Sequence, residues 1–400
     1  MNTLGIDYQQ TSTVIALREG DEPGVRLRSI SDGQRRLIPN AVLGQQTWGS
    51  HALLAEERGG LRQGDDRQEG PWLDPAGAPV FWRALFRRAV AYLGGLEPVP
   101  TNGYRLVVGF QAENFPVAAA AVVRLATAAG FADPVCIPAT DALLCRWLAE
   151  RRTFDQHLVA SVVQGDTSTT VRAYRLHPGE AGRATVTAAG AITTVPGAGQ
   201  AAWVRRITQL VSDRLGGTIP AEDELAVREA AVEFGARLSQ SDEHQAVAWS
   251  GPLSERMLEP VQTTRAASLA LPEIQALEEA LGAALAKALA KTGAGDQPDL
   301  VLRGGPGAVW PFGLNALLKT VPAKRIWQSA DPAQDVAWGA AWWPETGKLS
   351  EQVLRWSSAS VARVGPSVTV APAPQPAIAE PSEAESAPVP PWKRKTWMDV

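Results

Sequence analysis

The sequence predicts an α/β protein with two similar lobes, each a mixed β-sheet with flanking helices. Two observations predict this fold. A strand, a polar turn, a second strand, a third strand and then helices occur in that order near residue 3, and the same order begins again near residue 158. The 400 residues are enough for one large unit of this kind. The order of strands and helices repeats, but the amino-acid sequence does not. Such a repeat suits two lobes with a ligand cleft between them.

The first lobe is predicted over residues 1–155. Its strands are recognised by short apolar and β-branched runs that polar turns interrupt. An Ala-rich stretch predicts a helix over Val117–Ala129 that ends at Gly130, and Thr140 is the expected N-cap of a second helix. The strands are expected at Thr3–Asp7, Thr11–Leu17, Val25–Ser29, Arg105–Phe110 and Pro134–Ile137.

The second lobe is predicted over residues 156–345. A continuous apolar run, the polar turn QGDTST and two further strand-like runs open it, and long helical stretches follow. Strands are expected at Leu158–Val163, Thr170–Leu176, Ala184–Ile192 and Leu300–Leu302. Helices are expected at Gln200–Leu215, Glu222–Leu238 and Pro272–Lys291.

The C-terminal part of the sequence differs in composition. Residues 346–365 are predicted to be a closing helix or connector, and residues 366–400 a disordered tail, because proline, alanine and serine dominate it. The tail ends in a basic and aromatic tip. We expect this tip to dock a protein partner, although an unstructured end with incidental tryptophans fits the residues equally well. Its candidate docking residues are Trp392, Lys393, Arg394, Lys395 and Trp397.

Charge and apolar patterning narrow the class of partner. The net charge of −4 gives no electrostatic reason to expect nucleic acid or an anionic membrane. No stretch approaches the roughly 20 apolar residues of a membrane span, and the N-terminus has no signal-peptide pattern. Two cysteines are too few for a disulfide framework. The expected location is therefore the cytoplasm.

An ordered series of segments resembles the ATPase part of the 70-kDa heat-shock chaperones. The series spans about the first 345 residues and includes LGIDYQQTSTVIAL, VASVVQGDTSTTVRAYRL, DLVLRGGPGAVWPFG and SADPAQDVAWGAAWW. The resemblance implies an actin-like ATPase fold that binds ATP or ADP with magnesium. It also implies that the chain lacks the peptide-clamping domain with which these chaperones continue.

The resemblance places the nucleotide site on three segments. Asp7 would contact magnesium through water, and Asp7 and Asp166 are the candidates for catalysis. The nucleotide-binding positions would be Asp7, Gln9, Gln10, Thr11, Ser12, Asp166, Thr167, Ser168, Thr169, Ser239, Gly304 and Gly305. The residues alone leave a plainer interpretation open: hairpin-turn residues at Asp7 and QGDTST, and a glycine pair that lets a helix pack closely.

Several positions depart from the family pattern. Gln164 stands where the second loop has an aspartate, and Asp166 brings a negative charge where glycine would approach phosphate. Pro138 replaces the catalytic glutamate, and no lysine precedes Lys287. The residues that clamp adenine fall near Gly235 and Ala236.

The sequence therefore predicts a degenerate member of this family with weak or absent ATPase activity, acting as a binding or regulatory module. Two alternatives stay open. One is an active, chaperone-like ATPase with a rearranged site that uses Asp7, Asp166 and an arginine. The other is an actin-like scaffold or filament protein.

Overall fold

A computed structural model describes residues 2–9, 12–19, 104–111, 115–128, 130–150, 155–178, 183–219, 221–241, 262–290, 292 and 297–343. It also describes short strands at residues 27–30, 38–39, 41–43, 47–48, 67–69, 245–246 and 353–357. The C-terminal tip with Trp392 and Trp397 lies outside the described residues, as do Gln10 and Thr11. No helix among the described residues is both long and apolar enough to cross a membrane.

The first sheet has the strand order β3-β2-β1-β8-β9. Strand β1 pairs antiparallel with β2 and parallel with β8, and β8 pairs parallel with β9. These strands are Asn2–Tyr8 (β1), Ser12–Arg18 (β2), Leu27–Ile30 (β3), Tyr104–Phe110 (β8) and Val135–Pro138 (β9), and Ile38–Pro39 (β4) pairs with β2. A separate small sheet contains Ala41–Leu43 (β5), Thr47–Trp48 (β6) and Arg67–Glu69 (β7).

The second sheet has the order β17-β16-β10-β11-β12-β18. Strand β10 pairs antiparallel with β11 and parallel with β16, which pairs parallel with β17. The strands are Leu158–Gln164 (β10), Ser168–Pro178 (β11), Arg183–Ala188 (β12), Leu300–Gly304 (β16), Ile326–Trp327 (β17) and Val353–Ser357 (β18). Thr193–Pro196 (β13) also pairs with β11, and Gln245–Ala246 (β14) pairs with Gln262–Thr263 (β15) elsewhere.

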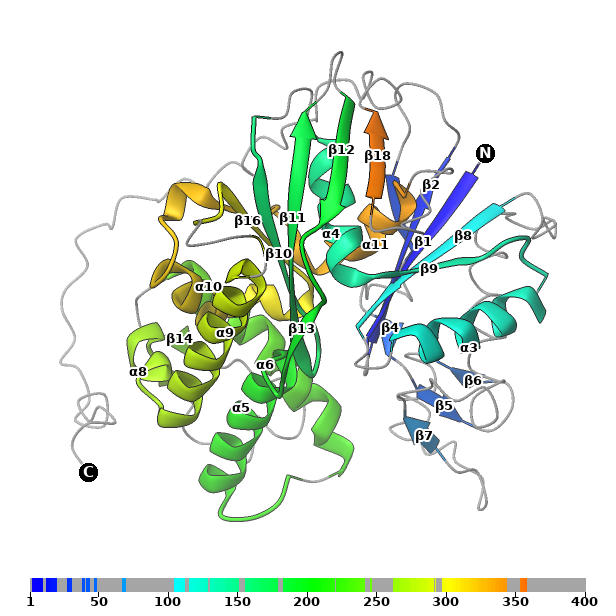
Figure 1. Ribbon diagram of the computed structural model, residues 1–400. Coiled ribbons are helices and arrows are strands. Elements are labelled where there is room, and N and C mark those ends of the chain that lie inside the picture. Colours follow the sequence, from blue (N-terminus) through cyan, green and yellow to red (C-terminus); the bar gives the residue numbers. More distant parts are fainter. Residues whose placement is uncertain are drawn as a thin grey trace, which may run out of the picture. The chain divides into compact units, whose positions relative to one another are not determined.

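The two sheets share one arrangement. In each sheet, three antiparallel strands that are consecutive in the chain lie side by side, β3-β2-β1 in the first sheet and β12-β11-β10 in the second. Two parallel strands from later in the chain then follow, β8-β9 in the first sheet and β16-β17 in the second. The central strands are continuous apolar runs because both faces of the sheet are covered: every residue of β8 and β10 is buried. The chain is therefore an α/β protein with mixed sheets and flanking helices, as the sequence predicts (Figure 1).

The helices follow the strands in the predicted order. Helices α9 and α10 pack together, and α9 covers β11 and β13 of the second sheet, while α5 packs on α6 (Figure 1). The α-helices are Phe115–Ala128 (α3), Ala139–Ala149 (α4), Gln200–Leu215 (α5), Ala221–Gln240 (α6), Arg265–Leu269 (α8), Pro272–Ala290 (α9), Pro311–Leu318 (α10) and Asp335–Ala341 (α11). Short 3-10 helices are Pro306–Val309 (η3), Ala323–Arg325 (η4) and Pro332–Gln334 (η5).

Two predicted details are wrong, and the structure adds a third feature. Helix α4 begins at Ala139 directly after β9, so Pro138 is its N-cap and Thr140 lies inside the helix. The strand predicted over Ala184–Ile192 ends at Ala188, and a separate strand, β13, begins at Thr193. Within the predicted closing helix or connector, the described residues Val353–Ser357 extend the second sheet as β18, because they pair antiparallel with β12.

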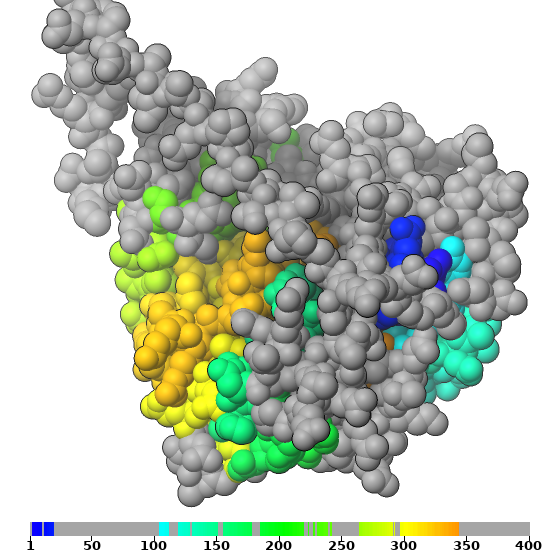
Figure 2. All heavy atoms as spheres, turned by 90° about the horizontal axis from the view of Figure 1, so that it is seen from above, coloured from blue at the N-terminus to red at the C-terminus, as the bar shows by residue number. Residues whose placement is uncertain are grey.

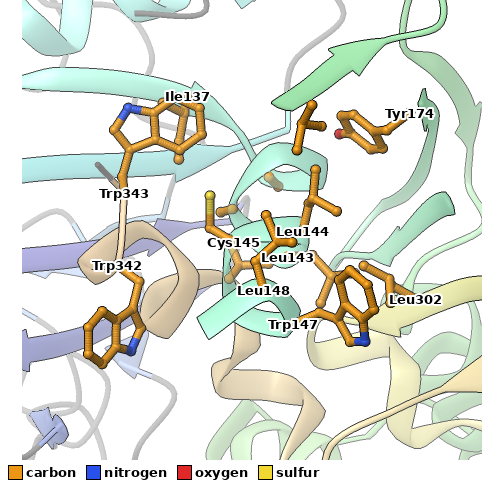
Figure 3. Close-up of a cluster of buried hydrophobic side chains, with 14 of the residues drawn as sticks. Ile137, Leu143, Leu144, Cys145, Trp147, Leu148, Tyr174, Leu302, Trp342 and Trp343 are labelled. Carbon is orange, nitrogen blue, oxygen red and sulfur yellow. The ribbon is translucent and has the colours of Figure 1, made fainter. Parts of the chain in front are cut away.

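Helix α4 lies at the centre of the main core. All eleven of its residues are buried. It contacts β8 and β9 of the first sheet, β10, β11 and β16 of the second, and α11. Figure 3 shows Leu143, Leu144, Trp147 and Leu148 of α4 among side chains from both sheets, with Trp343 nearby. This helix therefore joins the cores of the two sheets.

Helix α11 covers the N-terminal hairpin. It contacts β1, β2 and β8 on one side and α4 on the other. Ala337 and Ala341 of α11 are fully buried with Val14 and Ala16 of β2. In the space-filling view of Figure 2, spheres of the N-terminal strands (blue) lie beside those of the segment that contains β8 (cyan), which agrees with the pairing of β1 and β8.

Glycines permit this close packing, and they generate a stability prediction. A Cβ atom at Gly339 of α11 would lie 1.8 Å from the carbonyl oxygen of Ala142. Gly339→Ala should therefore lower the free energy of unfolding by about 3 kcal/mol, because two helix backbones must separate. The measurement is urea denaturation. The matched control is Gly282→Ala in α9, where a Cβ meets nothing within 4 Å and should stabilise the helix by about 0.5–1 kcal/mol. Equal midpoints for the two variants would contradict the packing described.

Candidate functional site

The turns of two hairpins, one from each sheet, meet through a carboxylate. Asp166 lies in the turn between β10 and β11, and Ser12 begins β2 after the first turn. The backbone N–H of Ser12 donates to Oδ2 of Asp166 at 3.0 Å, and its hydroxyl lies 3.2 Å from the same oxygen. Both residues are buried, so these charge-assisted bonds are shielded from water. We call the contact between these two turns, made by residues 7–9 and 12 on one side and 164–169 on the other, the turn contact.

Gln9 adds a second link across the turn contact. Its Nε2 donates to Oδ1 of Asp7 at 2.6 Å, and its Oε1 accepts from the backbone N–H of Asp166 at 3.4 Å. Within the first turn, the backbone N–H of Gln9 also donates to the carbonyl of Ser12. One amide side chain therefore connects the carboxylate of the first turn to the backbone of the second.

Gln111, directly after β8, supplies a third link that sequence reasoning missed. Its Nε2 donates to the Val163 carbonyl at 2.7 Å and to the Thr170 hydroxyl at 3.1 Å, and its Oε1 accepts from Ser168. A Cβ atom at Gly165 would lie 2.2 Å from this Oε1 and 2.5 Å from Oε1 of Gln9, so a larger residue there would displace both side chains. The available signal was positional: β1 and β8 are parallel neighbours, so the residues that follow them lie at one sheet edge.

The backbone of the second turn is also engaged. Gly165 donates to the Ser168 carbonyl and closes the turn. The first N–H groups of α5 donate to the carbonyls of Gly165 and Asp166, and the Thr169 hydroxyl donates to the Ala198 carbonyl. These helix N–H groups are therefore satisfied by the protein itself and not directed at an open site.

The environment of the first turn disfavours a negative charge on Asp7. Burial raises the pKa of Asp7 well above its ordinary value, the Gln9 hydrogen bond opposes this, and nearby Asp166 adds to it. Oδ2 of Asp7 is buried without a hydrogen-bond partner among the described residues. Within the described ranges, no group of three or more His, Cys, Asp or Glu side chains could hold a metal ion.

The glycine pair at the end of β16 serves close packing. Gly305 has a φ of 92°, and a Cβ atom there would lie 2.4 Å from the Gln164 carbonyl oxygen. At Gly304 a Cβ would lie 2.6 Å from Leu143 of α4. The pair thus lets β16 approach β10 and α4. Ser239 lies in α6, but its side chain is outside the described residues, and Thr167 is half-buried in the second turn.

An aromatic stack lies against helix α6. Trp310 and Trp203 are buried and stacked, with ring centroids 5.0 Å apart and planes at 15°. Phe312 lies against Trp203 at 5.7 Å. A Cβ atom at Gly235 of α6 would lie 2.6 Å from the Trp310 ring, so the indole rests directly on the backbone of that helix.

Arg303 and Gln164 form a buried polar link between β16 and β10. Arg303 donates from Nε to the Gln164 Oε1 at 2.7 Å, from Nη2 to the Trp310 carbonyl at 2.5 Å, and from Nη1 to Gln328. All three acceptors are neutral. Burial consequently lowers the pKa of Arg303 to about 9. Gln164, where the family pattern has an aspartate, thus serves as a structural acceptor.

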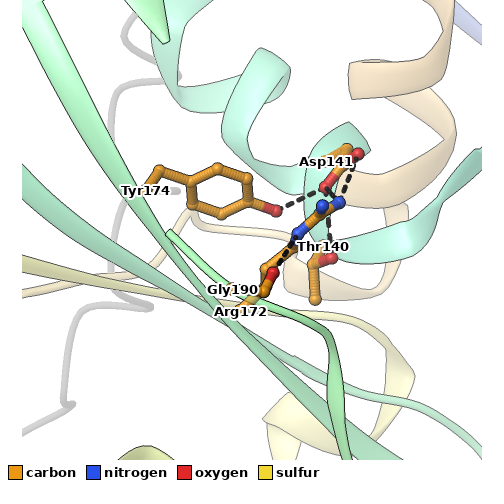
Figure 4. Close-up of polar contacts among 5 residues, drawn as sticks. All are labelled: Thr140, Asp141, Arg172, Tyr174 and Gly190. Carbon is orange, nitrogen blue, oxygen red and sulfur yellow. Dashed lines mark hydrogen bonds and ion pairs between the residues drawn. The ribbon is translucent and has the colours of Figure 1, made fainter. Parts of the chain in front are cut away.

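A second polar cluster ties α4 to β11 (Figure 4). Asp141 accepts from Arg172 Nη1 at 2.9 and 3.0 Å and from the Tyr174 hydroxyl at 2.5 Å, and Arg172 Nε donates to the Gly190 carbonyl. Burial raises the pKa of Asp141, while Arg172 opposes the shift. Sequence reasoning missed this cluster, although residues 172 and 174 share one face of a strand.

A third carboxylate, Asp335, opens α11 next to α4. Its Oδ1 lies 3.5 Å from Nε of Arg146, which also pairs with Glu150 and stacks over Trp338. Burial raises the pKa of Asp335 to about 7, against the opposing effects of Arg146 and Ser329, while Glu150 and Asp331 raise it further.

No protein-family model matches the chain, and a comparison with curated proteins finds no significant match. Function is therefore inferred from the residues themselves. Among the candidate site residues, the fold brings Asp7, Gln9, Ser12 and Asp166 together, and it links Ser168 to Gln111. The hydrogen-bond donors of Gln9 and Ser12 are directed at Asp7 and Asp166 of the protein itself.

The Asp141 cluster generates a mutational prediction. Asp141→Asn should lower the free energy of unfolding by about 3–5 kcal/mol, because the largely buried Arg172 loses its carboxylate. Tyr174→Phe removes one hydrogen bond and should cost about 1–2 kcal/mol. Chemical denaturation measures both. The exposed Asp155→Ala serves as a control within about 0.5 kcal/mol of the parent. A smaller effect for Asp141→Asn than for Tyr174→Phe would contradict the cluster's role.

Asp335 generates a pH prediction. Because its folded pKa of about 7 exceeds the ordinary value, the folded chain holds a proton that the unfolded chain releases between about pH 4 and pH 7. The contribution of Asp335 to stability therefore falls as pH rises through this range. Asp335→Asn should abolish that fall, so the variant should gain stability relative to the parent by up to about 2.6 kcal/mol from pH 5 to pH 8. Denaturation at several pH values measures it, and parallel profiles would refute the assignment.

Proposed function

We propose that this chain is a degenerate member of the heat-shock-70-like family, with a two-lobed actin-like fold, and that it works as a nucleotide-independent binding or regulatory module. The shared strand order of the two sheets supports the duplicated fold. So does the closing helix α11, which lies at the segment DVAWGAA that the resemblance assigns to it and contacts the first sheet.

The observation that carries the proposal is the turn contact. A working phosphate site needs backbone N–H groups that point at the ligand and small residues that let it approach. Here the Ser12 N–H is directed at Asp166, and the first N–H groups of α5 are directed at turn carbonyls. The two proposed phosphate loops thus bind each other, which leaves these donors engaged before any nucleotide arrives.

The proposed adenosine side supports the same conclusion. Gly235 occupies the position that the resemblance assigns to an adenine clamp, and the Trp310 ring covers it. That ring is fully buried against Trp203. The position of the catalytic glutamate is Pro138, which caps α4 and has no group for proton transfer.

A protein partner is the proposed ligand, and the proposed docking element is the tip with Trp392 and Trp397. Its aromatic and basic residues are suited to an apolar pocket with an acidic rim. The proline-rich segment before the tip would set its reach. In this scheme the two-lobed body acts as a scaffold that presents or orients the tip.

The proposal predicts the outcome of a nucleotide titration. Isothermal titration of the full chain with ATP and ADP, with and without magnesium, should give no heat of binding up to millimolar nucleotide. Thermal shifts should likewise be absent, because bound ligand would raise Tm by mass action.

Binding with a Kd near 1 μM, about −8 kcal/mol, would overturn the proposal. If such binding required magnesium and was lost in Asp166→Ala, it would favour the rearranged ATPase. Nucleotide-dependent sedimentation would favour an actin-like filament protein.

A further inference from the structure

The Asp166 carboxylate has the environment of a bound ligand. Two donors of Ser12, the backbone N–H and the hydroxyl, converge on its Oδ2 at 3.0 and 3.2 Å. Asp166 is 2% exposed, and Ser12 belongs to a different sheet, 154 positions earlier in the chain. An N–H and an O–H that meet at one carboxylate oxygen resemble the donors that proteins use to hold small oxyanions.

The backbone holds this carboxylate in place. The Asp166 N–H donates to Gln9, and its carbonyl accepts from Ala201 at 2.6 Å in the first turn of α5. A Cβ atom at Gly199 would lie 2.5 Å from the Asp166 carbonyl, so glycine is needed for this approach. The carboxylate is thereby preorganised, and little conformational entropy is lost when Ser12 binds it.

We propose that Asp166 is an intramolecular ligand that occupies an oxyanion cradle formed by Ser12, and that this latch holds the two turns together without any external anion. This inference rests on the proposed function in one respect only, that the turns derive from a phosphate site. The ligand class of the cradle is a small monoanion. The cradle is buried and offers two neutral donors, which disfavours a second negative charge.

The experiment is chemical rescue in the full-length chain. Asp166→Ala removes the carboxylate and leaves space, so Tm should fall by roughly 5 °C. Sodium formate should then raise the Tm of this variant along a saturating curve, and inorganic phosphate should act more weakly. Sodium chloride at equal ionic strength should not reproduce the effect. The parent chain should show no saturable response to formate, because its cradle is filled.

Two further variants control the rescue. Asp166→Asn keeps the volume of the side chain, so formate should not rescue it. Asp155→Ala removes an exposed carboxylate elsewhere and should behave like the parent. Equal formate responses in the parent, Asp155→Ala and Asp166→Ala would overturn the proposal, since they would indicate a general salt effect. An unchanged Tm in Asp166→Ala would overturn it as well.

A double-mutant cycle keeps the proposal testable if Asp166→Ala does not fold. The cycle combines Ser12→Ala with Asp166→Asn, both of which preserve most of the packing. The Tm changes should be non-additive, because each substitution weakens the same contact. Additive changes would refute the latch. A nucleotide that binds the parent chain would refute the proposed function and leave these outcomes unaffected, so the two failures can be told apart.

Discussion

The burial of helix α4 is the constraint on which the rest of the structure depends. A helix with no exposed face must satisfy every polar group within the protein, because an unpaired buried charge costs several kcal/mol. The buried carboxylate of Asp141 is satisfied by hydrogen bonds from Arg172 and Tyr174 of β11. One ion-paired cluster thereby fixes the orientation of the helix that both sheets use as their core.

Much of the fold could be predicted because its signals are local. The apolar run Leu158–Val163 and the glycine-terminated helix near Gly130 each reveal an element within a dozen residues. Gly130 has the expected positive φ of 98°. Thr140 shows the limit of such signals. Thr140 has a side chain suited to an N-cap, but it lies inside α4, because β9 continues directly into the helix and Pro138 takes the N-cap position.

The candidate site was predictable as a set of positions and not as a set of contacts. Sequence patterns placed Asp7, Ser12 and Asp166 on two turns, yet nothing local indicates that Ser12 binds Asp166 across 154 positions. Gln111 was missed for the same reason, since its partners belong to the other sheet. Asp166, which looked unsuited to a phosphate loop, is explained once its acceptor role towards Ser12 is seen.

The contact between α11 and the N-terminal hairpin has a consequence for synthesis. Strands β1 and β2 end by Arg18, but the helix that covers them is not complete until Ala341. At about 5–20 residues per second, the ribosome needs on the order of 20–60 s to supply that cover. During this interval the apolar face of the hairpin that α11 covers in the folded protein emerges without that helix. Nascent-chain binding factors are therefore expected to matter more for this protein than for one whose first strands are covered by their sequence neighbours.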